Sequence, residues 1–287
     1  MRLGDEDPSG NFIDRTGRGG MGFGGGGGNL LGCLLPLVAS RFGIVGVLIL
    51  LLGYCALTSL GGGGLIPGSS PSTTAPSGTS TLDPNTKDVL ARVLGSTERR
   101  WSEIFARNGA QYQPTKMIAY SNMDQSGCGA AQAAMGPFYC PTDQSIYIDP
   151  TFFNELSQRF GAPGDFAVAY VIAHEVGHHV QNLQGTLERA SQAQARASRT
   201  EGNQLQVGVE LQADCYAGVW AANDKNLMEP GDLEEGMRAA EAIGDDTLQK
   251  QMQGRVVPES FTHGTAAQRQ AALRRGLETG DPASCRF

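Results

Sequence analysis

The run A-H-E-V-G-H-H-V-Q at residues 173–181 constrains this chain more than any other part of its sequence, and it holds three of the four histidines. His174 and His178 are four residues apart, so on a helix they lie on one face, one turn from each other. Two imidazoles in that arrangement can bind one metal ion, and Glu175 can reach a water on that ion. The pattern is the H-E-x-x-H signature of zinc-dependent hydrolases.

The run lies inside a segment with helix signals at both ends. Asp165 is a typical helix cap, and Gly185 is a typical residue just after a helix end. We therefore expect a helix over about residues 165–183, with the motif well inside it. His179 points about 100° around such a helix from His178. We therefore give His179 no part in binding the same ion.

A third metal ligand must come from elsewhere, because a catalytic zinc ion has three protein ligands and one water. Glu210 and Asp214 are the best candidates, since they are four residues apart in a predicted helix over residues 205–222 that is apolar on nearly every face. Buried carboxylates need a partner or a metal. We expect Glu210 to bind the ion and Asp214 to accept the free ring N–H of a ligand histidine. The alternative is two solvated acids on a surface helix.

Two further residues are candidates for a supporting role. His263, in S-F-T-H-G-T, is the one histidine outside the cluster, and it is a candidate catalytic residue that stabilises the oxyanion of the reaction or supports the metal ligands. The alternative is a loop histidine that caps the following helix. Arg269 either pairs with a carboxylate near the site or is a solvated surface arginine.

Elsewhere, short strand signals come early in the domain and helix signals come late. Strands are expected over residues 116–120, 138–140 and 145–149. Further helices are expected over residues 83–106, 151–160, 187–199, 232–244 and 265–277. The predicted fold class is α+β, mostly helical, with a small β-sheet.

The N-terminal part of the chain differs from the rest in composition. Residues 1–28 are polar and then glycine-rich, which predicts a disordered cytoplasmic tail. Within residues 29–60, an uncharged apolar run at about 43–60 predicts a single transmembrane helix that anchors the chain. A buried core helix and a cleaved signal peptide are the alternatives. Residues 61–82, rich in Gly, Ser, Thr and Pro, predict a linker to a folded domain over residues 83–287.

The distribution of charge predicts an orientation for that helix. Four arginines precede the apolar run, and the first basic residue after it is Lys87. The positive-inside rule then predicts a single-pass protein of the cell membrane, with a cytoplasmic N-terminus and the domain outside. The net charge of −7 and the lack of a lysine or arginine run argue against a nucleic-acid partner.

Four cysteines lie in the predicted exterior domain: Cys128, Cys140, Cys215 and Cys285. An even number in an oxidising compartment predicts two disulfide bonds. Of the three possible connectivities, proximity in the sequence favours Cys128–Cys140, which leaves Cys215–Cys285. The alternative is four buried free thiols.

Five segments carry a resemblance to a known family. They are C-G-A-A at 128–131, G-P-F-Y-C-P-T-D-Q-S-I-Y-I-D at 136–149, A-Y-V-I-A-H-E-V-G-H-H-V-Q at 169–181, E-L-Q-A-D-C-Y-A-G-V-W-A at 210–221 and T-H-G-T-A-A-Q-R at 262–269. Over about residues 115–287 the chain resembles the bacterial neutral zinc metallopeptidases. That family is similar to gluzincins, in which a downstream Glu completes H-E-x-x-H. The resemblance implies a zincin-like domain with zinc at His174, His178 and Glu210, and with Glu175 as the catalytic base.

The sequence therefore predicts a membrane-anchored, zinc-dependent endopeptidase that hydrolyses peptide or protein substrates with a zinc-activated water. In this prediction Glu175 takes the proton from that water and passes it to the leaving amine. Two alternatives are a catalytically inactive relative that acts as a binding module, and a metal-binding envelope protein without turnover. The intact Glu175 favours the enzyme over the inactive relative.

Overall fold

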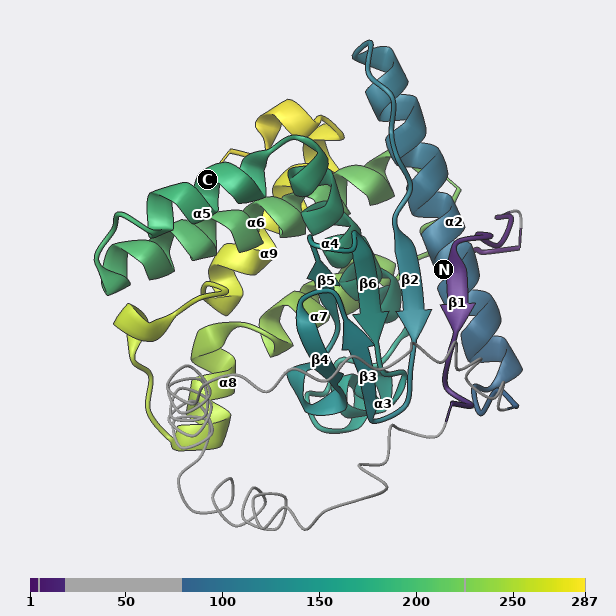
Figure 1. Cartoon of the computed structure of the whole chain (residues 1–287), viewed down its shortest axis with the longest axis horizontal. Coiled ribbons are helices and arrows are strands. Elements are labelled where there is room, and N and C mark those ends of the chain that lie inside the picture. The colour runs from purple at the N-terminus through teal and green to yellow at the C-terminus, as the bar shows by residue number, and fades with distance from the viewer. Residues whose placement is uncertain (5, 19–78, 225, 287) are drawn as a thin grey trace, which may run out of the picture. The chain divides into compact units, whose positions relative to one another are not determined.

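The computed structural model describes residues 1–4, 6–18, 79–224 and 226–286, and the elements below belong to these ranges (Figure 1). The helices are α2 (Pro84–Arg107), α3 (Thr151–Gln158), α4 (Asp165–Leu183), α5 (Thr186–Gln194), α6 (Arg199–Asn223), α7 (Asp232–Ala242), α8 (Asp245–Gln253) and α9 (Ala266–Thr279). The strands are β1 (Phe12–Asp14), β2 (Lys116–Ala119), β3 (Met123–Ser126), β4 (Gly129–Gln132), β5 (Phe138–Cys140) and β6 (Ser145–Ile148). The predicted class, mostly helical α+β with a small sheet, is confirmed.

The main sheet has the strand order β1-β2-β6-β5, as Figure 1 shows. β1, β2 and β6 run parallel, and β5 pairs antiparallel with β6. Every residue of β6 is buried, because the strand has a neighbour on each side and helices behind it. β3 and β4 form a separate antiparallel hairpin. β5 therefore lies at an edge of the main sheet, where its outer backbone groups face away from β6.

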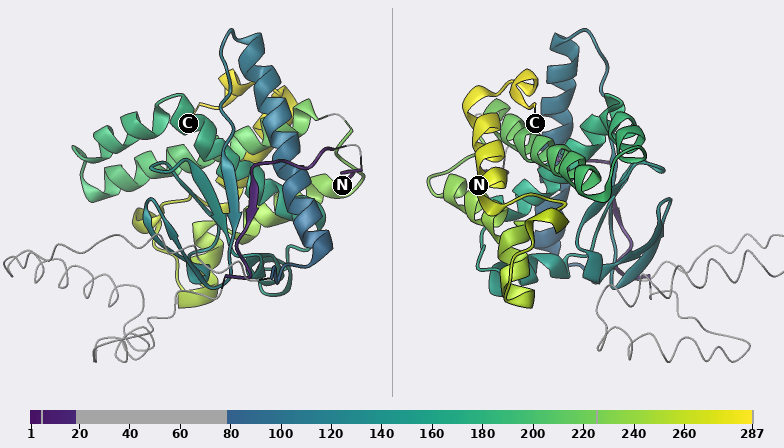
Figure 2. Two further views of the ribbon diagram at one scale, coloured as in Figure 1. Left: turned by 45° about the vertical axis from the view of Figure 1, so that its right-hand side comes forward. Right: turned by 90° about the vertical axis from the view of Figure 1, so that its left-hand side faces the viewer.

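The helices pack on one another behind the sheet, and the right-hand view of Figure 2 shows the sheet on one side and α7, α8 and α9, in light green to yellow, on the other. α4 is in contact with α6 and α7, and α6 is in contact with α9. Gly177, inside the H-E-x-x-H motif, lies at a close approach of α4 to α6. A Cβ atom at this position would lie 2.9 Å from the backbone oxygen of Ala213. A side chain there would therefore push the two helices apart.

Both disulfide bonds are present with the predicted connectivity. The first joins Cys128 and Cys140, whose Cα atoms are 5.8 Å apart, and it ties the β3–β4 turn to the end of β5. The second joins Cys215 and Cys285, whose Cα atoms are 5.6 Å apart, and it ties α6 to the C-terminal residues of the chain. Each bond therefore anchors an element that lies beside or within the candidate site.

Residues 6–18 correct the prediction of a disordered tail over residues 1–28. β1 pairs with β2 in the register Phe12 to Met117 and Asp14 to Ala119. Before the strand, the Ser9 hydroxyl donates to Glu98 on α2 at 2.8 Å. The tail prediction is wrong for residues 1–4 and 6–18, because residues 12–14 extend the sheet and the Arg2 N–H donates to the Leu227 carbonyl at 2.7 Å. The glycine-rich residues 19–28 lie outside the described part of the chain.

The prediction of a single-pass membrane protein also needs correction. In the described ranges, no helix combines the length and the apolar character needed to cross a bilayer, and the longest two, α2 and α6, both contain charged residues. The predicted span at 43–60 and most of the linker at 61–82 lie outside those ranges. The backbone N–H of Thr81 donates to the Thr16 hydroxyl at 3.1 Å. Because β1 pairs directly with β2, the two strands lie on the same side of any membrane, whereas a single span between them would put them on opposite sides.

Deleting residues 6–18 is expected to lower the stability of the folded unit. The deletion removes the β1–β2 ladder and leaves the backbone of β2 without a partner on that side. We expect a loss of about 3 kcal/mol, counting about 1 kcal/mol for each of a few hydrogen bonds. In a domain of this size that corresponds to a fall of about 6–12 °C in Tm.

Thermal denaturation of the full chain and of the deletion variant measures this effect. A variant that lacks an equally long piece of residues 61–78 controls for chain length. An unchanged Tm after loss of residues 6–18 would show that β1 does not support the fold.

Candidate metal centre

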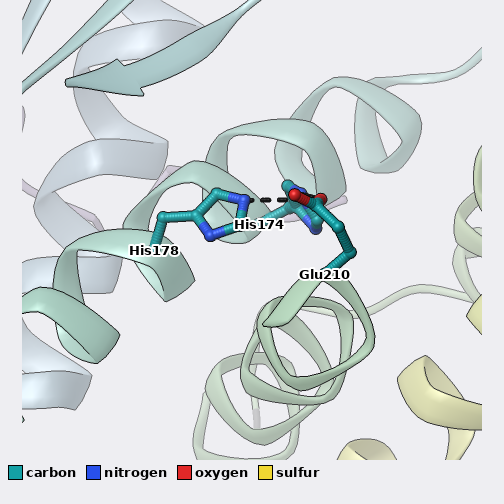
Figure 3. Close-up of side chains that lie close together, drawn as sticks. All are labelled: His174, His178 and Glu210. Carbon is teal, nitrogen blue, oxygen red and sulfur yellow. Dashed lines mark ion pairs between the residues drawn. The ribbon is translucent and has the colours of Figure 1, made fainter. Parts of the chain in front are cut away.

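His174, His178 and Glu210 point toward one another from α4 and α6 (Figure 3). The Glu210 Oε2 atom lies 3.2 Å from His174 Nε2 and 3.5 Å from His178 Nε2. One ligand atom from each of the three residues lies within 4.8 Å of the other two. His174 and Glu210 are buried, and His178 is partly exposed. The structure therefore brings together the three residues that the sequence predicts as metal ligands.

The other ring nitrogen of each histidine is held by an oxygen. His174 Nδ1 lies 2.8 Å from Asp214 Oδ1, and His178 Nδ1 lies 2.9 Å from Gln181 Oε1. The amide nitrogen of Gln181 donates to the Val209 carbonyl at 2.7 Å, which turns its oxygen toward His178. Both acceptors require a proton on Nδ1, so in each neutral ring the lone pair is on Nε2 and faces Glu210.

The spacing of the three donors fits a zinc ion. Zinc–ligand distances of about 2.0–2.1 Å at tetrahedral angles place neighbouring donor atoms about 3.3 Å apart. The observed separations of 3.2 and 3.5 Å are close to that value. Two imidazoles and one carboxylate also form the donor set of known zinc hydrolase sites. The residues present therefore fit zinc in number, chemistry and distance.

Glu175 lies beside these candidate ligands on the motif helix. It follows His174 on α4 and is 7% exposed. Within residues 79–224 and the other described ranges, no hydrogen bond or ion pair joins its carboxylate to another group. Its charge nevertheless acts on His178, whose pKa it helps to raise. A carboxylate that no other described group binds, next to a set of candidate metal ligands, has the location that a general base requires.

The charges of the cluster stabilise one another. Burial alone lowers the pKa of His174, but the carboxylates of Asp214 and Glu210 outweigh it and raise that pKa to about 10. Burial also lowers the pKa of His178, and Glu210 reverses the direction. Burial raises the pKa of Glu210, but the two imidazoles hold it well below its usual range. A divalent cation can take the place of the imidazole protons in this arrangement.

The affinity for zinc is expected to rise with pH. Below their raised pKa values both imidazoles carry protons that an incoming ion must displace, whereas Glu210 is ionised throughout. Between about pH 8 and pH 6, at least one proton is displaced, so the apparent affinity should fall about tenfold or more per pH unit. Competition with a chelator of known affinity at three pH values measures this slope. A flat profile would contradict the protonation states derived above.

Asp214 has the supporting position that the sequence predicts. It is fully buried and accepts a hydrogen bond from His174. It also accepts hydrogen bonds from Arg269 and Tyr170. Arg269 on α9 is 2% exposed and donates from Nε and Nη2 to the two Asp214 oxygens, each at 2.9 Å. Tyr170, one turn before His174, donates to Asp214 Oδ1 at 2.6 Å. Of the two alternatives for Arg269, the solvated surface arginine is excluded.

His263 lies outside the ligand cluster and its side chain is half-exposed. Its Nδ1 atom is 3.3 Å from Asp245 Oδ1, and the backbone N–H groups of residues 262–264 donate to Asp245 Oδ2. The neighbouring Gly264 packs against Val207 and Leu211 on the helix of Glu210. The cap of α9 is Thr265, so the helix-capping alternative for His263 is wrong. A catalytic role for His263 stays a prediction.

His179 has a different set of partners from its neighbour His178. Its Nε2 donates to the Gln113 carbonyl at 2.6 Å, and its Nδ1 accepts from the Tyr139 hydroxyl at 3.0 Å. Burial lowers its pKa, so the ring is neutral near neutral pH. Through Tyr139, His179 fixes the edge strand β5 against the motif helix α4. It faces away from the ligands, as its position on the helix predicts.

Comparison with known proteins shows the family to which the chain belongs. The model of the family described as "Putative neutral zinc metallopeptidase" matches residues 1–287. The chain is 50% identical to "Uncharacterized protein YpfJ" of Escherichia coli (strain K12) over 213 residues, or 72% of this chain and 74% of that protein. It is 46% identical to "Uncharacterized protein Rv2575" of Mycobacterium tuberculosis (strain H37Rv) over 187 residues, or 61% of this chain and 62% of that protein. No solved structure matches the chain. Because the family model matches residues 1–287, this protein belongs to the family described as "Putative neutral zinc metallopeptidase".

Proposed function

We propose that the protein is a zinc-dependent endopeptidase. The observation that carries the proposal is the convergence of His174 Nε2 and His178 Nε2 on Glu210 Oε2, at 3.2 and 3.5 Å, with the carboxylate of Glu175 beside them. When bound, a zinc ion supplies a water that is easily deprotonated and polarises the carbonyl of a peptide bond. His174, His178 and Glu210 would hold that ion.

The chain's own contribution to the reaction is proton transfer at Glu175. Its carboxylate oxygen would accept the proton of the attacking water and return it to the nitrogen of the leaving amine. The lack of a competing hydrogen-bond partner among the described residues leaves both oxygens free for this exchange. His263, from the loop that packs on α6, is the proposed donor to the oxyanion that forms on the carbonyl.

A peptide in extended conformation is the proposed substrate. β5 is an edge strand of the main sheet, it is in contact with α4, and the bond between Tyr139 and His179 fixes it there. A strand edge next to a catalytic helix can bind an extended peptide through its backbone N–H and C=O groups. Such binding does not require a free chain terminus, which supports an endopeptidase.

Digestion of a peptide library and of casein by the purified full chain tests the proposal. We expect cleavage within peptides, loss of cleavage on treatment with a chelator, and recovery when stoichiometric zinc is returned. Stoichiometric zinc without cleavage of any substrate would favour a metal-binding protein without turnover. Cleavage that persists in the chelator-treated, metal-free protein would overturn the proposal.

A further inference from the structure

We propose that Arg269 is a positioning residue of the metal centre, and that Tyr170 assists it. Arg269 fixes the carboxylate of Asp214, and through it the orientation of the His174 ring. This inference rests on the proposed function, because it assigns a role toward the ion that His174, His178 and Glu210 would hold. Arg269 lies in T-H-G-T-A-A-Q-R at 262–269, so the inference also gives that segment a part in the site.

The contact between Arg269 and Asp214 is bidentate and buried. Nε donates to Oδ2 and Nη2 donates to Oδ1, each at 2.9 Å. The remaining terminal nitrogen, Nη1, donates to the Ile243 carbonyl at 3.2 Å, at the end of α7. The guanidinium is therefore held both by the carboxylate and by a backbone carbonyl.

Asp214 in turn is saturated with donors. Its Oδ1 atom accepts from His174 Nδ1, from the Tyr170 hydroxyl and from Arg269 Nη2, while Oδ2 accepts from Arg269 Nε. Without Arg269, Oδ2 would have no donor among the described residues, and a fully buried carboxylate would lose its counter-charge. The carboxylate would then be free to turn, and the His174 ring would lose its fixed acceptor.

The orientation of His174 matters because the ring must present Nε2 to the ion. The bond from Nδ1 to Asp214 fixes both the tautomer and the rotation of the ring about its χ2 angle. Arg269 Nη2 also lies 3.4 Å from His174 Nδ1. The positive charge beside the ring offsets the charge of Asp214, so the carboxylate can orient the ring without adding a full negative charge to the centre.

The competing explanation is that the salt bridge between Arg269 and Asp214 only stabilises the fold. Measurement of zinc affinity distinguishes this from a positioning role. We expect Arg269→Lys to fold, because it keeps the charge, but to lose the bidentate contact. Loss of such an outer partner typically lowers metal affinity by about 10–100-fold, and we expect that effect here. Ser96→Ala is the matched control, since Ser96 bonds both Asp224 and Trp220 in a buried cluster away from the metal ligands. It should lower Tm and leave zinc affinity unchanged.

A double-mutant cycle tests whether Arg269 acts through Asp214. In an Asp214→Asn background, Arg269→Lys should have no further effect on zinc affinity, because the group that it positions is already changed. Additive effects of the two substitutions, or an unchanged affinity in Arg269→Lys alone, would overturn the inference. If Arg269→Lys fails to fold, Tyr170→Phe replaces it, with an expected loss of about fivefold from one hydrogen bond. Unchanged affinity in Tyr170→Phe would then count against the inference.

The affinity of the unsubstituted protein distinguishes the two possible failures. If the full chain binds no zinc at His174, His178 and Glu210, the proposed function itself fails. If the full chain binds stoichiometric zinc and Arg269→Lys binds it equally well, only the positioning role of Arg269 fails.

Discussion

Replacing Glu175 with Gln is expected to lower kcat/KM for peptide hydrolysis by about 10²–10⁴-fold, the usual contribution of a general acid–base. The amide has the size of the carboxylate but cannot take a proton from the attacking water. The ligands His174, His178 and Glu210 keep their partners in this variant, so zinc should bind with nearly unchanged affinity. The loss should therefore lie in the chemical step and not in metal content.

Peptide cleavage and zinc content, measured on the same preparations, check this result. Glu188→Gln is the matched control, because Glu188 is an exposed glutamate on α5 whose carboxylate accepts a hydrogen bond from Gln192. It should retain full activity. Undiminished cleavage by Glu175→Gln would rule out Glu175 as the base.

His178→Ala should lose the zinc site, whereas the neighbouring His179→Ala should keep it. His178 would supply one of three protein ligands. If a zinc-binding free energy of about 10–16 kcal/mol is shared equally among them, its loss lowers the affinity by about 10²–10⁴-fold. His179 binds the Gln113 carbonyl and Tyr139 instead. Its removal should lower Tm, because it deletes a buried ring and two hydrogen bonds.

Titration of zinc into the two variants, with Tm recorded for the metal-free proteins, measures the contrast. The two substitutions change the same residue type at adjacent positions of one helix, so each serves as the control for the other. Equal zinc affinities in the two variants would contradict the assignment of His178 as a ligand.

The convergence of the candidate metal ligands could be predicted because its signal is local and chemical. A spacing of four residues places His174 and His178 on one face of any helix. Glu210 and Asp214 stood out because charged residues in an otherwise apolar helix need a partner. The two disulfide bonds followed from the number and spacing of the cysteines.

The supporting contacts were harder to predict, since they join residues far apart in the sequence. Arg269 is 95 residues from His174, and nothing in the spacing selects Asp214 as its partner over solvent. The start of α6 was predicted at residue 205 but lies at Arg199. Ser198 and Glu201 form a capping box there, and this sequence signal could have located the helix start.

The N-terminal segment shows where composition misleads. A polar and then glycine-rich stretch predicts disorder, but β1 needs only three residues, because the pairing uses the backbone. The pairing of β1 with β2 also overturns the predicted membrane orientation. The positive-inside rule counts charges and takes no account of a contact between the parts of the chain before and after the apolar run. Only the packed structure supplies that information.

X-ray diffraction from crystals of the zinc-loaded full chain, recorded on both sides of the zinc absorption edge, tests the central claim most directly. We expect one anomalous peak about 2.0–2.2 Å from His174 Nε2, His178 Nε2 and a Glu210 oxygen, with one coordination position left to water. A fully loaded crystal in which the ion lies elsewhere, or in which Glu210 points away from it, would contradict the claim.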